Sequence, residues 1–148
     1  MNATPFRAKR GSDILGSMIK NTTNTTYDIQ YHFVWIPKYR KRVLQGQIKI
    51  RIEQLIQICA EINDFEILEL SICVDHIHLF LSAKPRFSPS EIMNLIKGGS
   101  SKKIREEFPE LEEVYWGDSF WADGYFVSTH STVAENVIRQ YIKEQRSA

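Results

Sequence analysis

Two histidines separated by one apolar residue are the strongest chemical signal in this sequence. His76 and His78 lie within residues 74–81, a segment rich in the residue types that favour a β-strand. Side chains alternate between the two faces of a strand, so both imidazoles project from one face, roughly 7 Å apart. Two imidazoles placed in this way can converge on one divalent metal ion. The pair alone is equally compatible with two partly buried histidines that have no ligand.

A second candidate group lies near the C-terminus, where Tyr141 and Gln145 are four residues apart. In a helix this spacing puts both side chains on one face, with roughly 6 Å between their β-carbons. The packed side of the same helix is supplied by Val133, Val137, Ile138 and Ile142. A tyrosine beside such a stripe often serves only as an amphipathic anchor. It can also be a nucleophile, with the amide oxygen of the glutamine available to a metal ion.

Length and composition indicate what kind of protein carries these candidate residues. The chain has 148 residues, of which 43% are hydrophobic, and this is enough for the core of one ordinary domain. Its formal net charge is only +1, so a polyanion must be held by local clusters of basic residues. Cys59 and Cys73 lie in apolar stretches without metal-type spacing, which indicates two reduced core cysteines in a cytoplasmic protein. Residues 1–20 contain no continuous apolar run, so neither a signal peptide nor a membrane span is expected.

The polar segment 21–26 divides the chain into a flexible N-terminal tail, residues 1–26, and a domain formed by residues 27–148. Apolar residues on both faces of residues 29–36 predict a central strand that ends at Pro37. Helical periodicity predicts a helix over residues 47–62, and two strands follow at residues 66–74 and 76–83. A tight reversal near Asp75 would connect them.

Two further helices carry clear start signals. Ser88 followed by Pro89 and Glu91 forms a capping box with proline at the first helical position. A fourth strand is expected at residues 124–129, and Thr132 with Glu135 predicts the start of a last helix that runs through residue 144. The order β-α-β-β-α-β predicts an α+β, ferredoxin-like split βαβ fold with an antiparallel sheet. The extra C-terminal helix carries the tyrosine.

Two clusters of basic residues and three aromatic side chains are candidates for contacts with a nucleic acid. The first basic cluster consists of Lys38, Arg40, Lys41 and Arg42. The second basic cluster consists of Lys97, Lys102, Lys103 and Arg105. Either cluster can neutralise backbone phosphates, or can simply be a solvated charged surface. Tyr39, Trp116 and Trp121 can stack on unpaired bases or can pack inside the fold.

The chain resembles the single-tyrosine HUH transposases of the insertion-sequence 200/605 family. The features that match, in family order, are residues 31–35, Lys38-Tyr39-Arg40, His76 with His78, residues 95–101, Phe120-Trp121, residues 124–127, and Tyr141 with Gln145. A single His-x-His pair is a weak motif, whereas the ordered set from about residue 27 to 146 is highly specific. The sequence departs from the family pattern at His130 and in its longer N-terminal tail.

The resemblance implies a metal-dependent DNA strand transferase. His76, His78 and Gln145 would hold Mg²⁺ or Mn²⁺, and Tyr141 would attack single-stranded DNA at the hairpin-bearing ends of an insertion sequence. The products would be a 3′-hydroxyl and a 5′-phosphotyrosine, whose ester bond can be reversed to rejoin strands. The resemblance also implies a homodimer in which the tyrosine helix of one subunit can complete the site of the other, and it implies no association with membranes.

Three other functions are compatible with the same residues. A domesticated relative that processes chromosomal repeats would use the same active site. A ferredoxin-like sheet can also be a non-catalytic single-stranded nucleic-acid-binding module whose aromatic residues stack on bases. Finally, a His-x-His phosphoesterase would use a histidine as its nucleophile in place of Tyr141. Replacing Tyr141 with phenylalanine separates the two enzymes, because only the transposase would lose cleavage.

Overall fold

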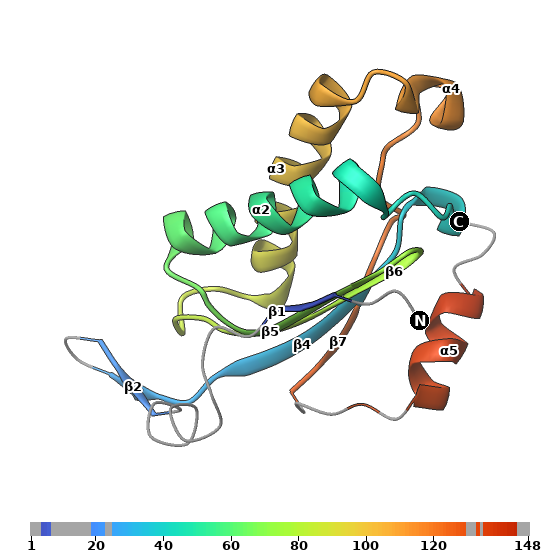
Figure 1. Cartoon of the computed structure of the whole chain (residues 1–148). Helices are drawn as coiled ribbons and strands as arrows, with labels where there is room; N and C mark the ends of the chain where they lie inside the picture. Colours follow the sequence, from blue (N-terminus) through green and yellow to red (C-terminus); the bar gives the residue numbers. More distant parts are fainter. Residues whose placement is uncertain (1–3, 7–18, 23–24, 130–132, 134, 145–148) are drawn as a thin grey trace.

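The computed structural model describes residues 4–6, 19–22, 25–129, 133 and 135–144. Within them, a five-stranded sheet with antiparallel pairing is the centre of the molecule. Helices α2 (Gly46–Asn63) and α3 (Pro89–Glu107) cover one face of this sheet (Figure 1). Helix α5 (Glu135–Glu144) packs on the opposite face. The sheet therefore separates two layers, and only one of them contains the long helices.

The strands follow a simple spatial order. Across the sheet they are β1 (Thr4–Phe6), β5 (Glu66–Cys73), β6 (His76–Ser82), β4 (Gln30–Trp35) and β7 (Phe126–Ser128). A separate hairpin pairs β2 (Lys20–Asn21) with β3 (Thr26–Tyr27). The short helices are η1 (Lys38–Arg40) and α4 (Leu111–Tyr115).

From β4 to β7, the elements follow the predicted β-α-β-β-α-β order, with α5 after them. Strands β4 and β6 are the first and third of this unit, and they are hydrogen-bonded neighbours. Val34 lies opposite His78, and Trp35 lies opposite Ile77. The α+β, ferredoxin-like prediction is confirmed, and so is the position of the histidine strand in the middle of the sheet.

Strand β4 is apolar on both faces because each face packs against a helical layer. Phe33 and Trp35 point into the main core beneath α2 and α3. Val34 points to the other face, where it packs with Ile138 and Ile142 of α5. All three β4 side chains are fully buried. A register slip of one residue would exchange the two sets of side chains, so this burial specifies the register.

The start of α3 is the capping box that the sequence predicts. The Ser88 hydroxyl accepts a hydrogen bond from the Glu91 backbone N–H at 3.1 Å, and the Ser88 N–H donates to the Glu91 carboxylate at 3.0 Å. Pro89 occupies the first helical position, where no N–H is needed. Together these residues set the point from which α3 runs across the sheet.

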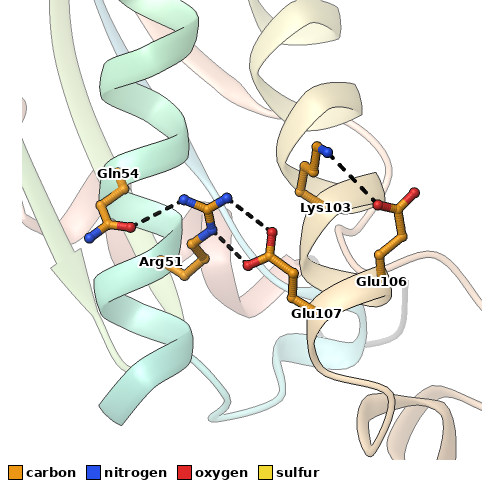
Figure 2. Close-up of polar contacts among 5 residues, drawn as sticks. All are labelled: Arg51, Gln54, Lys103, Glu106 and Glu107. Carbon is orange, nitrogen blue, oxygen red and sulfur yellow. Dashed lines mark hydrogen bonds and ion pairs between the residues drawn. The ribbon is translucent and has the colours of Figure 1, made fainter.

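A guanidinium–carboxylate contact joins the two long helices near their exposed edges. Arg51 of α2 donates to both oxygens of Glu107 on α3, at 2.7 and 2.9 Å, and also to Gln54 at 3.2 Å (Figure 2). Solvent screens an exposed ion pair, so this contact orients the helices more than it stabilises them. Their attachment depends on the apolar core between them and the sheet.

Helix α3 is also attached to the segment that leads into β7. The Lys97 ammonium donates to the backbone carbonyls of Ala122 at 2.8 Å and Gly124 at 2.9 Å. Farther along the helix, the buried Ser100 hydroxyl accepts a hydrogen bond from the Trp121 indole N–H at 3.0 Å. Two stretches that the resemblance rests on, residues 95–101 and 120–127, are thus structural partners.

The described parts of the N-terminal region contain structure that the sequence did not indicate. Strand β1 pairs with the edge strand β5, with Thr4 opposite Ile72, and β2 pairs with β3. Helix α4 was also not predicted, and β7 is shorter than the predicted strand at residues 124–129. Among the described helices, none is long and apolar enough to cross a membrane.

Candidate active site

Strand β6 presents His76 and His78 on the side of the sheet that α5 occupies. Val34 is opposite His78 in the register and packs against α5, so the two side chains share this face. Ile77, between the histidines, is fully buried in the core on the other face. The centroids of the two imidazole rings are 5.0 Å apart, and the rings are in a T-shaped arrangement. Strand alternation therefore brings two predicted metal ligands together.

Asp75 orients the first histidine. Its Oδ1 lies 2.8 Å from the Nδ1 atom of His76. Burial alone would lower the pKa of His76, but hydrogen bonds with Asp75 and Cys73 outweigh it and raise that pKa to about 9. The same hydrogen bond lowers the pKa of the Asp75 carboxyl. Because Nδ1 is engaged by Asp75, Nε2 is the nitrogen through which His76 could bind a metal, once the ring has given up the proton that its raised pKa keeps on it.

His32 on β4 orients the second histidine. The Nε2 atom of His32 lies 3.3 Å from Nδ1 of His78. Burial lowers the pKa of His78 to about 4, with further contributions from His76 and His32, so the imidazole is neutral near pH 7. Neutral imidazole is the form that binds metals. When the Nδ1–H of His78 donates to His32, the proton is on Nδ1. The Nε2 lone pair of His78 can then coordinate a metal ion.

Cys73 is a third donor at this place. Its sulfur and one nitrogen from each of His76 and His78 all lie within 4.8 Å of one another. Cys73 is free and buried, as the sequence predicts. The turn between β5 and β6 also puts it directly opposite His76, which its spacing in the sequence does not indicate. Cys59, on α2, is the half-buried free thiol that the sequence indicated, and burial raises its pKa.

Tyr141 lies on the same side of the sheet as the histidine pair. It packs on the cluster formed by Val34, Ile138 and other apolar residues, and its ring centroid is 6.1 Å from that of Phe126. Its hydroxyl is buried and has no hydrogen-bond partner among the described residues. Burial raises the pKa of Tyr141 to about 12. In this arrangement the phenol is neutral, and no described group is placed to take its proton.

An open groove borders the tyrosine helix. Its volume is about 560 Å³, and its lining is Phe126, Asn136, Val137, Gln140, Tyr141 and Glu144. Gln145, the third predicted metal ligand, lies outside the described residues, as do His130 and Thr132. The structure thus places Tyr141, His76 and His78 on one face of the sheet.

The first basic cluster lies beside the histidine turn. Arg40 pairs with Asp75 at 3.3 Å, and Asp75 in turn contacts His76. Lys41 and Arg42 are exposed. A phosphate that reached the histidine pair would therefore lie close to these cations. Lys38, the remaining member of this cluster, lies over the Tyr39 ring at 5.6 Å.

The second basic cluster lies on α3, in the layer that covers the other face of the sheet. Lys97 is bound to backbone carbonyls, and burial lowers the pKa of its ammonium. Lys102 and Lys103 are exposed, and Lys103 lies 3.9 Å from Glu106. Arg105 lies 3.5 Å from Glu112. The exposed members of this cluster belong to a different face of the molecule from the histidines.

The three candidate stacking residues differ in exposure. Trp121 is 3% exposed and packs inside the fold, whereas Trp116 is 89% exposed at the end of α4. Tyr39 is 44% exposed, and its hydroxyl donates to Asp118 at 2.5 Å. Only Trp116 and Tyr39 therefore present aromatic surface to a base.

Three residues of the site were not predicted as site residues. Asp75 and His32 hold the two imidazoles, and Cys73 adds a sulfur donor. A signal for Cys73 and Asp75 does exist, in the compact order Cys-x-Asp-His-x-His across residues 73–78. His32 gives no such signal, because its partner is 46 residues away and the register of two strands brings them together.

Comparison with known proteins shows the family to which this chain belongs. The family model "Transposase IS200 like" matches residues 25–145. The chain belongs to this IS200-like transposase family. It is 30% identical over 132 residues to the ISDra2 transposase TnpA of Deinococcus radiodurans, covering 89% of this chain and 94% of that protein.

Other relatives agree with this assignment. The transposase of insertion sequence element IS200 from Salmonella typhimurium is 35% identical over 128 residues, which cover 85% of this chain and 82% of that protein. A crystal structure of a Deinococcus radiodurans protein assigned to the transposases superposes with a TM-score of 0.76 at 30% identity. That match covers 87% of this chain and 99% of the other.

A more distant structure shares the fold alone. The REP-associated tyrosine transposase, solved bound to a REP hairpin, superposes with a TM-score of 0.52 at 14% identity. The match covers 83% of this chain and 67% of that one. The ferredoxin-like arrangement of sheet and helices is thus common to proteins with little sequence in common.

Proposed function

We propose that this transposase cleaves and rejoins single-stranded DNA at the hairpin-bearing ends of an insertion sequence, through a 5′-phosphotyrosine intermediate. The observation that carries the proposal is the histidine pair, with each Nδ1 atom held by a neighbour, on the sheet face that also carries Tyr141. Family membership supports the transposase chemistry, and the site residues supply its parts.

His76, His78 and Gln145 are the residues proposed to hold Mg²⁺ or Mn²⁺. The two histidines fit a divalent metal, because their rings are adjacent and Asp75 and His32 engage only the Nδ1 atoms. Metal binding would displace the proton that His76 carries because of its raised pKa. When bound, the ion would polarise the scissile phosphate and stabilise the charge that develops on it. His32 and Asp75 act as positioning residues, since each fixes the orientation of one imidazole.

Tyr141 is the proposed nucleophile. Its hydroxyl oxygen would form a bond to phosphorus while the bond from phosphorus to the 3′ oxygen breaks, and the proton of the phenol leaves as the released 3′ oxygen becomes a hydroxyl. The phosphotyrosine ester keeps a reactive phosphodiester, so another 3′-hydroxyl can reverse the attack and join strands. Hydrolysis by water would instead leave an irreversible nick.

The assembly that we propose is a homodimer with exchanged tyrosine helices, as the family resemblance implies. The hydroxyl of Tyr141 is buried, no residue in the described part of the chain hydrogen-bonds to it, and its pKa is raised to about 12, so this position does not activate the phenol. To reach a metal site, the Tyr141 side chain must leave its apolar surroundings. It can move toward the histidines of its own subunit or toward those of a second subunit. We propose the second route, in which the two sites form in trans.

Mixing two inactive variants tests the trans arrangement. A His76→Ala subunit keeps its tyrosine, and a Tyr141→Phe subunit keeps its histidines. In trans, a mixed dimer contains one complete site and regains cleavage, whereas in cis neither site is complete. Recovery of adduct on mixing would support exchanged helices. Full inactivity of mixed dimers, with dimer formation shown by cross-linking, would establish sites formed within one subunit.

Detection of a covalent protein–DNA adduct tests the function itself. Labelled single-stranded hairpin ends would be incubated with the protein and Mg²⁺ or Mn²⁺, or with a chelator, and separated on a denaturing gel. We expect an adduct that requires the metal and is absent in Tyr141→Phe. The matched control Tyr125→Phe alters another partly buried tyrosine and should keep the adduct.

The other outcomes identify the alternatives. Binding of hairpin DNA with no adduct under any condition would favour the nucleic-acid-binding module. Cleavage that persists in Tyr141→Phe would favour a histidine nucleophile. Adduct formation on dispersed chromosomal repeat hairpins, without activity on insertion-sequence ends, would indicate a domesticated relative.

A further inference from the structure

The turn between β5 and β6 brings a cysteine to the histidine pair. Cys73 is the last residue of β5, and His76 is the first of β6, directly opposite it. Side chains at directly opposite positions share a face of the sheet. His78, two residues farther along β6, shares that face as well. One sulfur and two nitrogens therefore converge, with their ligand atoms within 4.8 Å of one another.

This distance is close to what a tetrahedral metal site needs. Zinc binds thiolate sulfur at about 2.3 Å and imidazole nitrogen at about 2.0–2.1 Å, so one sulfur and two nitrogen ligands lie about 3.3 to 3.6 Å apart. Small side-chain rotations of Cys73, His76 and His78 would close the remaining gap. Three protein ligands leave the fourth position open, as in many zinc sites that also bind water or a substrate.

The donor set does not favour magnesium. Mg²⁺ prefers oxygen ligands in near-octahedral geometry, whereas thiolate and imidazole ligands select softer ions such as Zn²⁺. Cys73 is 3% exposed and forms the inner wall of the site, while the histidines are only partly buried and leave a path for an ion. The surroundings hold both imidazoles in place, through Asp75 and His32.

We propose that Cys73, His76 and His78 form a zinc site, with the cysteine as a thiolate ligand and one position left open. Binding would release the thiol proton to solvent, together with any proton on the imidazoles. The site shares its histidines with the catalytic metal site, so Zn²⁺ would compete there with Mg²⁺ or Mn²⁺. This inhibition of cleavage rests on the proposed function, whereas zinc binding does not.

Spectroscopy of the metal-loaded protein tests the site without any assay of cleavage. The metal-free wild-type protein would be titrated with Co²⁺ and with Zn²⁺ alone. We expect a near-ultraviolet sulfur-to-cobalt charge-transfer band at one equivalent, and X-ray absorption of the zinc form should show one sulfur ligand at about 2.3 Å. A zinc environment of nitrogen and oxygen only, in the wild-type protein, would overturn the proposal.

Variants identify the sulfur. Cys73→Ser should abolish the charge-transfer band and weaken zinc binding at least tenfold in competition with a chromophoric chelator. Cys59→Ser is the matched control, because this other cysteine lies on α2, outside the cluster, and it should keep both properties. If Cys73→Ser fails to fold, Cys73→Ala serves in its place, and the wild-type absorption spectrum still decides. Unchanged zinc affinity in a folded Cys73 variant would contradict the assignment.

Cleavage assays then separate this proposal from the proposed function. If adduct forms with Mn²⁺, low Zn²⁺ should inhibit the wild type, and Cys73→Ser should need at least tenfold more Zn²⁺ for the same inhibition. Equal inhibition of both proteins would overturn the competition. If no adduct forms with any metal, the proposed function fails, while the zinc–sulfur signal still supports or overturns the site on its own.

Discussion

Asp75 and His76, adjacent in the chain, form a hydrogen-bonded pair with 2.8 Å between Oδ1 and Nδ1. The pair has an ionic component, because the pKa of His76 is raised to about 9 and that of Asp75 is lowered. Arg40 contacts the other carboxylate oxygen of Asp75 at 3.3 Å. One carboxylate therefore links the histidine pair to the first basic cluster.

Replacing Asp75 with asparagine should lower the pKa of His76 in the metal-free protein. Without the carboxylate, only the interactions with Cys73 still oppose burial, so the pKa should fall from about 9. Because the folded state favours protonated His76, this residue contributes to the free energy of unfolding. The contribution is complete below pH 6.5 and is lost as the pH rises through about 9. Histidine ring-proton NMR over a pH series measures the shift. Asp64→Asn, which alters an exposed carboxylate elsewhere, should leave it unchanged.

Local patterns in the sequence were enough to predict the elements that carry the chemistry. Strand alternation placed His76 and His78 together, and the Ser88 capping box marked the start of α3, because both depend on residues within a few positions. The apolar character of both faces of β4 likewise indicated a central strand. These are features in which local preference and tertiary structure agree.

Features that depend on register or on distant segments could not be predicted in the same way. Cys73 joins the histidines only because of a tight turn, and His32 reaches His78 only because two strands pair in one register. Lys97 looked like a phosphate ligand, but carbonyl groups more than twenty residues away bind its ammonium. Strand β1 is likewise defined by its pairing with β5 and not by its own composition.

Tyr141→Phe should fold at least as stably as the wild type. The Tyr141 hydroxyl is buried, and within the part of the chain that the structure describes it has no hydrogen-bond partner. Burying such a group costs about 1–3 kcal/mol in desolvation. Removing it should leave the free energy of unfolding unchanged or raise it by about 1 kcal/mol, as measured by urea denaturation. Tyr115→Phe removes another buried hydroxyl that has no partner among the described residues, and it should change the free energy of unfolding in the same direction. A loss of stability in Tyr141→Phe would show that the hydroxyl has a partner in solution.

The phenol of Tyr141 should ionise only at strongly alkaline pH in the free protein. Its raised pKa of about 12 means that the folded state favours the neutral phenol. The resulting stabilisation is complete below about pH 10, the ordinary pKa of tyrosine, and is lost as pH rises toward 12. Spectrophotometric titration of wild type minus Tyr141→Phe isolates this group. A difference curve with its midpoint at the ordinary pKa would place the phenol in water instead.

The two basic clusters should differ in their contribution to DNA binding. Lys41 and Arg42 are exposed beside Arg40, which contacts the histidine turn, whereas Lys102 and Lys103 are exposed on α3 in the layer over the other face. Replacing the first pair with alanine should weaken binding of a single-stranded hairpin and reduce the salt slope by about 1 per lost phosphate contact. Fluorescence anisotropy at several salt concentrations measures both quantities. A larger loss from the α3 pair would place the DNA on the helical layer.

Lys97→Met should reduce stability and not DNA affinity. The ammonium donates to the carbonyls of Ala122 and Gly124, and its removal leaves both without this donor, at a cost of about 1–3 kcal/mol. Urea denaturation should show this loss, whereas Lys102→Met, at an exposed neighbouring position, should lie within about 0.5 kcal/mol of the wild type. The affinity of the folded Lys97→Met protein for hairpin DNA, measured by fluorescence anisotropy, should depend on salt concentration with the wild-type slope. A reduced slope with unchanged stability would instead mean that Lys97 releases the carbonyls and binds phosphate when DNA is present.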